Sequence, residues 1–196
     1  MRRQELDSLR IGWDLVIDID CTVFDYSKIA ADLVIKALKF HKVKSVSCKF
    51  SGNKGFHIGV PFEAFPEKAE NEDIKNIFPD APKKIALYIK HMILEEFGER
   101  ILNLEGEISK VLEKTGKKAS EVIYKDKGRT KFNADSILQM DTLLISPRHL
   151  YRMPYSLHEK SGLVSIPLNP DKVLLFKKEF ALPKNVRISG HRFLSR

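Results

Sequence analysis

The sequence predicts an α/β fold of the α+β kind, in which antiparallel strands and helices share one chain. The prediction rests on an alternating apolar segment at 14–24, a segment with helical periodicity at 28–41, and two strand-like segments around a glycine turn within 45–62. With 196 residues, 43% of them hydrophobic, the chain can bury a sizeable core as one large domain or two small lobes.

The first strand and the first helix follow from their apolar periodicity. In 14–24, every second residue from Ile17 to Val23 is apolar, so one face of a strand would be buried. Ser27 is a residue type that caps helices, and an apolar stripe then repeats at helical spacing along 28–41. A strand followed by an amphipathic helix is therefore expected.

The later elements follow from proline, glycine and composition. Pro82 suits the first turn of a long helix in which Gly98 is a candidate position for a kink, and Gly116 suits the end of a shorter helix. The predicted elements are a hairpin of strands 45–50 and 56–62, a polar loop or short irregular helix at 66–80, helices at 82–105 and 107–114, a basic loop at 125–135, and a strand-like segment at 136–146.

The net charge of +8 indicates an anionic partner, either nucleic acid or the phosphates of a nucleotide. The alternative interpretation is ordinary surface charge that maintains solubility. A charge excess by itself does not name the partner, so the decision depends on the motifs.

The two cysteines, Cys21 and Cys48, form no CxxC pair, so we expect no structural zinc and a reduced, intracellular protein. No apolar segment approaches the roughly 20 residues of a membrane span. The N-terminal residues also lack the apolar region of a signal peptide. A cytoplasmic, nucleoid-associated protein without membrane contact is expected.

Asp18 and Asp20 are the first candidates for chemistry. Residues two apart in a strand point to the same face, about 7 Å apart. Two carboxylates on one face repel each other unless a cation lies between them, and Mg²⁺ prefers carboxylate and phosphate oxygens. The alternative is a solvent-facing strand that happens to carry two acids.

The turn SGNKG and the residues after it are the second candidate. Gly52 and Gly55 allow backbone angles that direct N–H groups toward an anion. Ser51 adds a hydroxyl group, Lys54 a charge and His57 a ring donor, so the hairpin could hold a triphosphate. The P-loop pattern is absent, and the alternative is a loose hairpin with a structural histidine.

The third candidate is the basic, proline-containing segment 148–163. Arg148, Arg152, His158 and Lys160 fall within it, and such a segment can close over phosphates. Taken alone, it is more typical of a surface loop with scattered charges.

Together, the three segments resemble the archaeo-eukaryotic primases, in particular the catalytic small subunit of archaeal and eukaryotic DNA primase. VIDIDC resembles the family's strand with two acids, and FSGNKGFHI resembles its Ser-Gly-x-x-Gly-x-His hairpin. HLYRMPYSLHEKSGLVSIP is similar to the family's late basic segment. The order is the same, and the resemblance spans about residues 14–168.

The resemblance implies a template-dependent nucleotidyl transferase, a DNA primase or primase-polymerase, with sheets that form a cleft flanked by helices. Two divalent cations, Mg²⁺ or Mn²⁺, would be held by Asp18, Asp20 and a third acid, for which Asp141 is the best match and Asp135 the weaker one. The implied nucleotide-binding residues are Ser51, Gly52, Asn53, Lys54, Gly55, His57, Arg152 and His158.

The implied nucleic-acid partners are a single-stranded DNA template and a primer, with NTPs or dNTPs as substrates. A primase large subunit or other replication proteins are further candidate partners. The expected phosphate contacts are Arg148, Lys160, Lys125, Lys127, Arg129 and Lys131, with Arg187, Arg192 and Arg196 in the tail.

The chain departs from the family in one region and in length. Relatives usually carry a zinc module between the hairpin and the third acid, whereas this chain has predicted helices and no cysteine there. We expect a catalytic domain over 1–180 with a helical insertion at about 66–125, and a basic tail at 181–196.

Two other functions compete with primer synthesis. Bacterial end-joining polymerase domains share the acidic pair and the hairpin, so a repair role of the same fold is possible. A non-catalytic nucleic-acid-binding relative is the second alternative, although the retained acids and histidines disfavour it.

Overall fold

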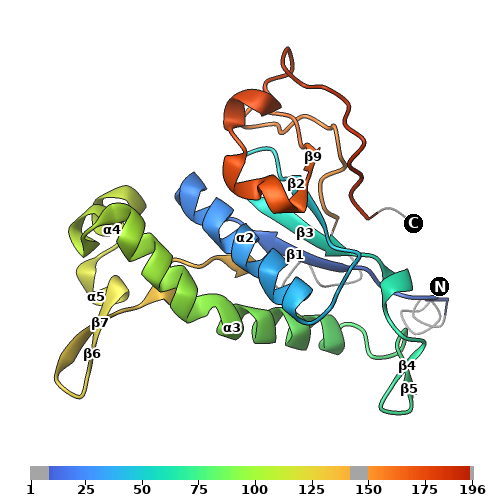
Figure 1. The fold of residues 1–196 in the computed structure, drawn as a ribbon, viewed down its shortest axis with the longest axis horizontal. Helices are drawn as coiled ribbons and strands as arrows, with labels where there is room; N and C mark the ends of the chain where they lie inside the picture. The colour runs from blue at the N-terminus through green and yellow to red at the C-terminus, as the bar shows by residue number, and fades with distance from the viewer. Residues whose placement is uncertain (1–8, 142–149, 195–196) are drawn as a thin grey trace.

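One antiparallel sheet joins strands from distant parts of the chain in the computed structural model, which describes residues 9–141 and 150–194. The strand order is β8-β1-β3-β2-β9, so the predicted hairpin of β2 and β3 lies beside the first strand (Figure 1). The strands are β1 (Leu15–Ile19), β2 (Ser47–Phe50), β3 (Phe56–Val60), β8 (Met140–Asp141) and β9 (Pro167–Leu168). This mixture of sheet and helices confirms the predicted α+β class.

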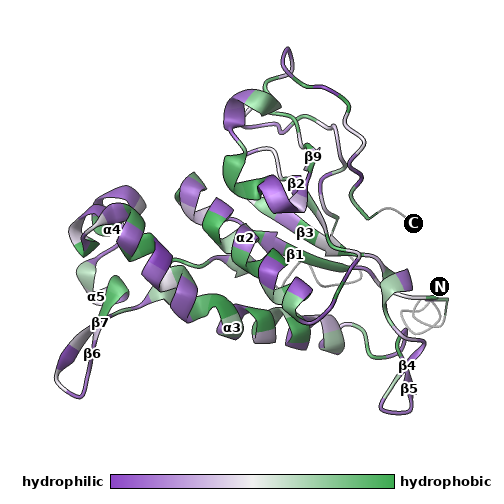
Figure 2. Cartoon of the chain, viewed as in Figure 1, coloured by the Kyte–Doolittle hydropathy of each residue, from purple (hydrophilic) through white to green (hydrophobic). Residues whose placement is uncertain are grey.

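Helices α2 (Phe24–Phe40) and α3 (Asp80–Glu105) pack on each other, and α2 packs along β1 and β3 (Figure 1). Polar and apolar residues alternate along both helices in Figure 2, as expected for helices with one buried face. Two shorter helices follow, α4 (Ile108–Thr115) and α5 (Ala119–Val122). No helix in the described ranges has the length and apolar character that a membrane crossing requires.

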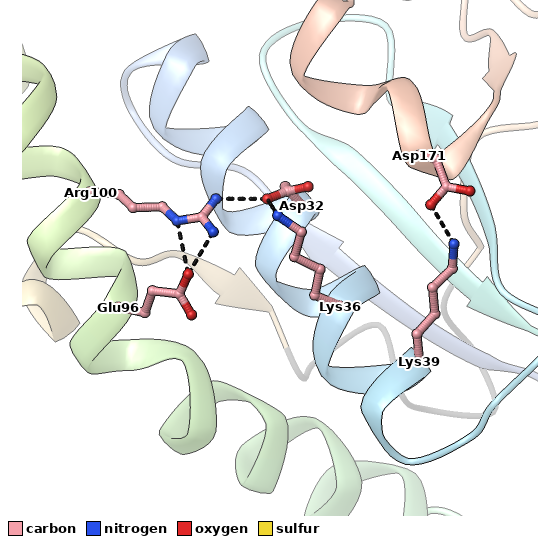
Figure 3. Close-up of polar contacts among 6 residues, drawn as sticks. All are labelled: Asp32, Lys36, Lys39, Glu96, Arg100 and Asp171. Atoms are coloured by element: carbon pink, nitrogen blue, oxygen red, sulfur yellow. Dashed lines mark hydrogen bonds and ion pairs between the residues drawn. The ribbon is translucent and has the colours of Figure 1, made fainter.

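Polar contacts also fix α2 in place. Arg100 of α3 donates a hydrogen bond of 2.7 Å to Asp32 of α2 and further bonds to Glu96 (Figure 3). Lys39, near the end of α2, pairs with Asp171 in a 3-10 helix that follows β9. Because Asp32 is mostly buried, its ion pair with Arg100 compensates for the desolvation of the carboxylate.

The first helix begins earlier than predicted, and Ser27 is not its cap. The helix starts at Phe24 with Val23 as N-cap, and Ser27 lies inside the helix, fully buried, with its hydroxyl 3.5 Å from the carbonyl oxygen of Cys21. Packing explains the earlier start, since the Phe24 ring stacks on Phe56 at 5.8 Å between centroids. Burial of an aromatic side chain outweighs the modest benefit of a serine cap.

The segment 66–80, expected to be a loop or an irregular helix, contains a small hairpin. Its strands are β4 (Lys68–Ala69) and β5 (Glu72–Asp73), and the two residues between them, Glu70 and Asn71, have positive φ angles. Two consecutive residues with positive φ are typical of the tight turns that join antiparallel strands.

The basic loop predicted at 125–135 is also a hairpin, made of β6 (Ile123–Asp126) and β7 (Arg129–Phe132). Lys127 and Gly128 form its turn, with φ angles of 48° and 78°. Figure 1 shows this hairpin projecting from one end of the molecule, beside α5 and away from β2 and β3. The loop prediction was therefore wrong, because alternating charged residues hide the strand pattern.

Helix α3 runs through Gly98 as one continuous helix. A Cβ atom at Gly98 would lie 3.0 Å from the side chain of Ala134, so the glycine permits close packing of the chain after β7. The predicted end of the next helix is confirmed, since Gly116 has the left-handed conformation typical of a helix C-terminus.

Candidate active site

A row of polar residues crosses the sheet at the level of Asp18. The strand register places Asp18 opposite Asp141 on one side and opposite His57 on the other, and His57 opposite Lys49. Directly opposed residues in antiparallel strands project from the same face. Two acids, a histidine and a lysine therefore share the face opposite to the buried Ile17.

A cavity of about 220 Å³ opens on this face. Its walls come from the end of β1, the turn between β2 and β3, and the segment 150–158. These are the regions that the sequence analysis singled out, and the fold brings them together. The lining residues are Asp18, Asp20, Ser51, Asn53, His57, Leu150, Tyr151, Arg152 and His158.

Asp18 in β1 and Asp20 just after it both have pKa values raised by their surroundings. The pKa of Asp18 is raised to about 7, mainly by burial. The nearby negative charges of Asp20 and Asp141 contribute to the same increase. Burial also raises the pKa of Asp20, while the positive charges of Lys54 and His158 act in the opposite direction. A cation between these carboxylates would relieve the repulsion and favour their ionised forms.

Asp141 is a third acid next to Asp18, although it is not among the residues that line the cavity. It lies in β8, directly opposite Asp18. Asp135 lies in a 3-10 helix that packs on α3, where it forms an ion pair of 2.6 Å with Lys90. Of the two candidates, the structure thus brings only Asp141 to the acidic pair.

The glycine turn is shaped by two different requirements. Gly52 has a φ angle of 105°, which other residues rarely adopt, so its conformational freedom is needed as predicted. Gly55 has no such angle; a Cβ atom there would lie 2.1 Å from the carbonyl oxygen of Ile19 and 3.0 Å from Asp20. The expectation of unusual backbone angles was wrong for Gly55, which instead lets the turn approach the end of β1.

His57 is more buried than expected. Its side chain lines the cavity but is only 5% exposed, and its Nε2 atom lies 3.4 Å from a carboxylate oxygen of Asp18. Burial and the nearby charges of Lys49 and Arg152 lower its pKa to about 3, so the ring is neutral near pH 7. Nδ1 is buried without a hydrogen-bond partner among the described residues. His57 is therefore a neutral group beside Asp18 rather than a freely projecting cation.

Arg152 and His158 bring nitrogen groups to the lining of the same cavity. Arg152 donates to the carbonyl oxygen of Leu157 at 2.8 Å and pairs with Glu159 at 2.6 Å, which the sequence analysis did not consider. The backbone N–H groups of Lys160 and Ser161 point at Nδ1 of His158. A neutral His158 ring therefore carries its proton on Nε2, which is the arrangement that donates to an anion.

Lys49 lies opposite His57 beside the cavity without lining it, and the sequence analysis missed this residue. It is fully buried, and its Nζ donates to the hydroxyl group of Ser165 at 3.2 Å. No ion pair with a carboxylate is formed by Lys49 within the described ranges. The sequence could have indicated this residue, because the five-residue turn after Phe50 sets the register of the hairpin and so places residue 49 opposite His57. Leu150 and Tyr151 were also missed, although both lie in the segment singled out as basic.

Other expected residues lie away from the cavity lining. Lys54 is close enough to affect the pKa of Asp20 but does not line the cavity, and Lys160 is exposed. Lys131 pairs with Asp126 within the distant hairpin of β6 and β7. Arg148 and Arg196 lie outside the described residues. The remaining basic residues of the hairpin and tail, Lys125, Lys127, Arg129, Arg187 and Arg192, stay predictions as phosphate contacts.

The donor set fits divalent cations that are bound together with a phosphate. Asp18, Asp20 and Asp141 offer only oxygen ligands, which suits Mg²⁺ or Mn²⁺. Within residues 9–141 and 150–194, no three acidic, histidine or cysteine side chains converge closely enough to form a complete metal cage. Mg²⁺ commonly uses one or two carboxylates plus substrate phosphates, so an incomplete protein cage agrees with that mode. Cys21 and Cys48 are both buried, and the expected lack of structural zinc stays a prediction.

A family model described as DNA primase small subunit matches residues 17–170, which include Asp18 and Asp20, the glycine turn and the segment after Leu150. The chain belongs to the DNA primase small subunit family. The resemblance seen in the sequence is thereby confirmed.

A curated relative is an uncharacterized protein of Methanocaldococcus jannaschii, to which the chain is 43% identical over 61 residues. The matched part covers 31% of this chain and 14% of that protein. The chain therefore matches only a small part of the relative's length, and the relative supports similarity over that part.

Proposed function

We propose that the protein is a template-dependent nucleotidyl transferase that synthesises or extends primers with two divalent cations. The observation that carries this proposal is one cavity that is lined both by acids and by groups able to bind an anion. Asp18 and Asp20 line it with Ser51, Arg152 and His158. Negative and positive groups that face one cavity suit a substrate whose phosphates bridge to metal ions.

The acids and the nitrogen groups have separate roles in this proposal. Asp18, Asp20 and Asp141 would hold the cations, which neutralise phosphate charge and favour attack of a primer 3′-hydroxyl group on the α-phosphate, with pyrophosphate leaving. Arg152 and the Nε2–H group of His158 would hold the β- and γ-phosphates. These residues contribute position and charge, which supply most of the catalysis in phosphoryl transfer.

The nucleic-acid partners follow from the same proposal. A single-stranded DNA template and a primer end would approach the cavity, with NTPs or dNTPs as substrates. A primase large subunit is a candidate partner for starting a chain. The exposed basic residues of the hairpin and tail would contribute contacts to backbone phosphates rather than to bases.

The test is an assay on single-stranded template with Mg²⁺ or Mn²⁺ and each nucleotide type, with and without a supplied primer. Products without a primer would establish priming. Extension only from a primer would favour the repair or end-joining type of polymerase. Binding of template without any incorporation would leave the non-catalytic alternative and contradict the proposal.

Replacing Asp141 by asparagine should lower the rate of primer extension roughly tenfold. The change removes one negative charge next to Asp18 while keeping the side-chain shape, so cation binding should weaken by about 1.4 kcal/mol. Extension is measured as a function of Mg²⁺ concentration. Asp135→Asn is the matched control, and an equal loss in both variants would contradict the assignment of the third acid.

Replacing His57 by alanine should lower kcat/KM for the nucleotide about threefold to tenfold. The reason is the loss of one hydrogen bond from a neutral ring, which is worth about 0.5–1.5 kcal/mol. Kinetics and the melting temperature are measured on the same preparation. A lower melting temperature with unchanged kinetics per folded molecule would show that His57 is a core residue without a role in nucleotide binding.

A further inference from the structure

The C-terminal segment packs against the sheet beside the cavity. The backbone N–H group of Leu194 donates to the hydroxyl group of Ser47 at 3.1 Å, and this hydroxyl group donates to the carbonyl oxygen of Gly59 at 3.1 Å. The segment is therefore tied to both strands of the hairpin that carries the glycine turn. The basic tail predicted at 181–196 therefore contacts the sheet at Leu194.

Gly59 makes room for this packing. It lies two residues after His57 in β3, so a side chain at 59 would project from the same face as the histidine. A Cβ atom at Gly59 would lie 2.8 Å from Leu194 and 2.9 Å from the ring of Phe193. Gly59 has no positive φ angle, so space for the tail, and not backbone freedom, accounts for the glycine.

Phe193 packs near two rings that line the cavity. Its ring centroid lies 6.4 Å from that of His57 and 5.8 Å from that of Tyr151, both of which line the cavity. The Nζ atom of Lys49 lies 5.3 Å from the same ring, within the range of a cation–π contact. One aromatic side chain therefore packs against a cavity histidine, a cavity tyrosine and the buried lysine.

We propose that Phe193 is a positioning residue for the incoming nucleotide, acting through His57 and Tyr151; this inference rests on the proposed nucleotidyl transfer. Contact with Phe193 fixes the orientation of both rings, and the same phenyl ring keeps water away from Lys49. Exclusion of water strengthens the attraction between this buried cation and a triphosphate, because the local dielectric constant falls. The C-terminal segment is then part of the nucleotide site.

The first test is Phe193→Ala. We expect KM for the nucleotide to rise fivefold to twentyfold in primer extension while kcat changes less than twofold, and the affinity for Mg-ATP in calorimetry to fall by the same factor as KM rises. Phe193→Tyr keeps the ring and should restore both values to within twofold. Ile188→Ala is the matched control, since Ile188 lies in the same segment and is 87% exposed.

Gly59→Ala displaces Phe193 from the strand side and leaves the tail sequence unchanged. It should raise KM in the same way, and combining it with Phe193→Ala should add little, because both changes remove one contact. This second variant keeps the inference testable if Phe193→Ala folds poorly.

The outcomes separate the inference from the function on which it rests. If the parent protein extends primers or binds Mg-ATP, and Phe193→Ala matches it in KM and affinity, the inference is overturned and the proposed function stands. If the activity of Phe193→Ala falls only in proportion to its fraction of folded protein, the inference is also overturned. If the parent protein neither incorporates nucleotides nor binds Mg-ATP, the proposed function fails and the inference falls with it.

Discussion

Replacing both Asp18 and Asp20 by asparagine should lower nucleotide incorporation by at least about a thousandfold. Both carboxylates line the cavity, and Asp18 is mostly buried beside two other acids. Loss of two anionic ligands would remove the cations from the site, and a thousandfold corresponds to about 4 kcal/mol of transition-state stabilisation. Single-nucleotide extension of a supplied primer, with Mg²⁺ and with Mn²⁺, measures the effect.

The control for this double variant is Asp25→Asn, which removes an exposed carboxylate that pairs with Lys28 at 2.7 Å. It should extend primers like the parent protein. Near-normal extension by the double variant, at equal folded concentration, would exclude the proposed metal chemistry.

Thermal unfolding of the double variant gives a second readout that separates a lost metal site from a lost fold. The pKa of Asp18 is raised to about 7 from 3.8, so the folded state binds this proton more tightly than the unfolded state. The metal-free parent protein therefore loses stability as the pH rises from about 4 to 7. The double variant lacks this loss, so its melting temperature should be at least that of the parent protein above pH 7.

The acidic pair and the glycine turn were predictable because both depend on short-range geometry. Alternation in a strand sets the face of Asp18, and the length of the turn sets the register of His57. The order of the strands in the sheet could not be predicted from such short-range geometry. The position of β1 beside β3, which places Asp18 opposite His57, depends on packing between segments about 40 residues apart.

The residues that the sequence analysis missed have a common cause. Lys49 reads as a surface charge in a strand, and its burial depends on Tyr151 and Phe193, which lie far along the chain. Gly59 has no visible role until the tail is folded against it. Long-range packing, which leaves no local pattern, decides the burial of Lys49 and the role of Gly59, although the length of the turn alone sets the register of Lys49 opposite His57.

Lys49 is a buried cation whose position opposes stability. It is fully buried with a hydroxyl group as its hydrogen-bond partner, and burial lowers its pKa to about 7 from 10.5. The unfolded state therefore holds this proton more tightly than the folded state. The protein loses stability as the pH falls from about 10.5 to 7, and the full penalty is present below pH 7.

Replacing Lys49 by methionine should therefore stabilise the protein while weakening its use of nucleotides. Apolar replacement of buried charges is often neutral or stabilising by about 1–4 kcal/mol, so the melting temperature should rise, most clearly below pH 7. A charge on the order of 8 Å from a phosphate contributes about 2 kcal/mol at an effective dielectric constant of 20, so kcat/KM should fall about thirtyfold. Thermal unfolding at several pH values and single-nucleotide extension measure the two effects.

Lys44→Met is the control, because Lys44 is an exposed lysine a few residues earlier in the chain. It should change neither the melting temperature nor the kinetics. A bound triphosphate would favour the ammonium form of Lys49, so added Mg-ATP should stabilise the parent protein more than the Lys49→Met variant. Unchanged kinetics in a stabilised Lys49→Met protein would show that the buried charge has no role at the site. A loss of activity despite greater stability would instead show that the sheet holds this charge for the nucleotide.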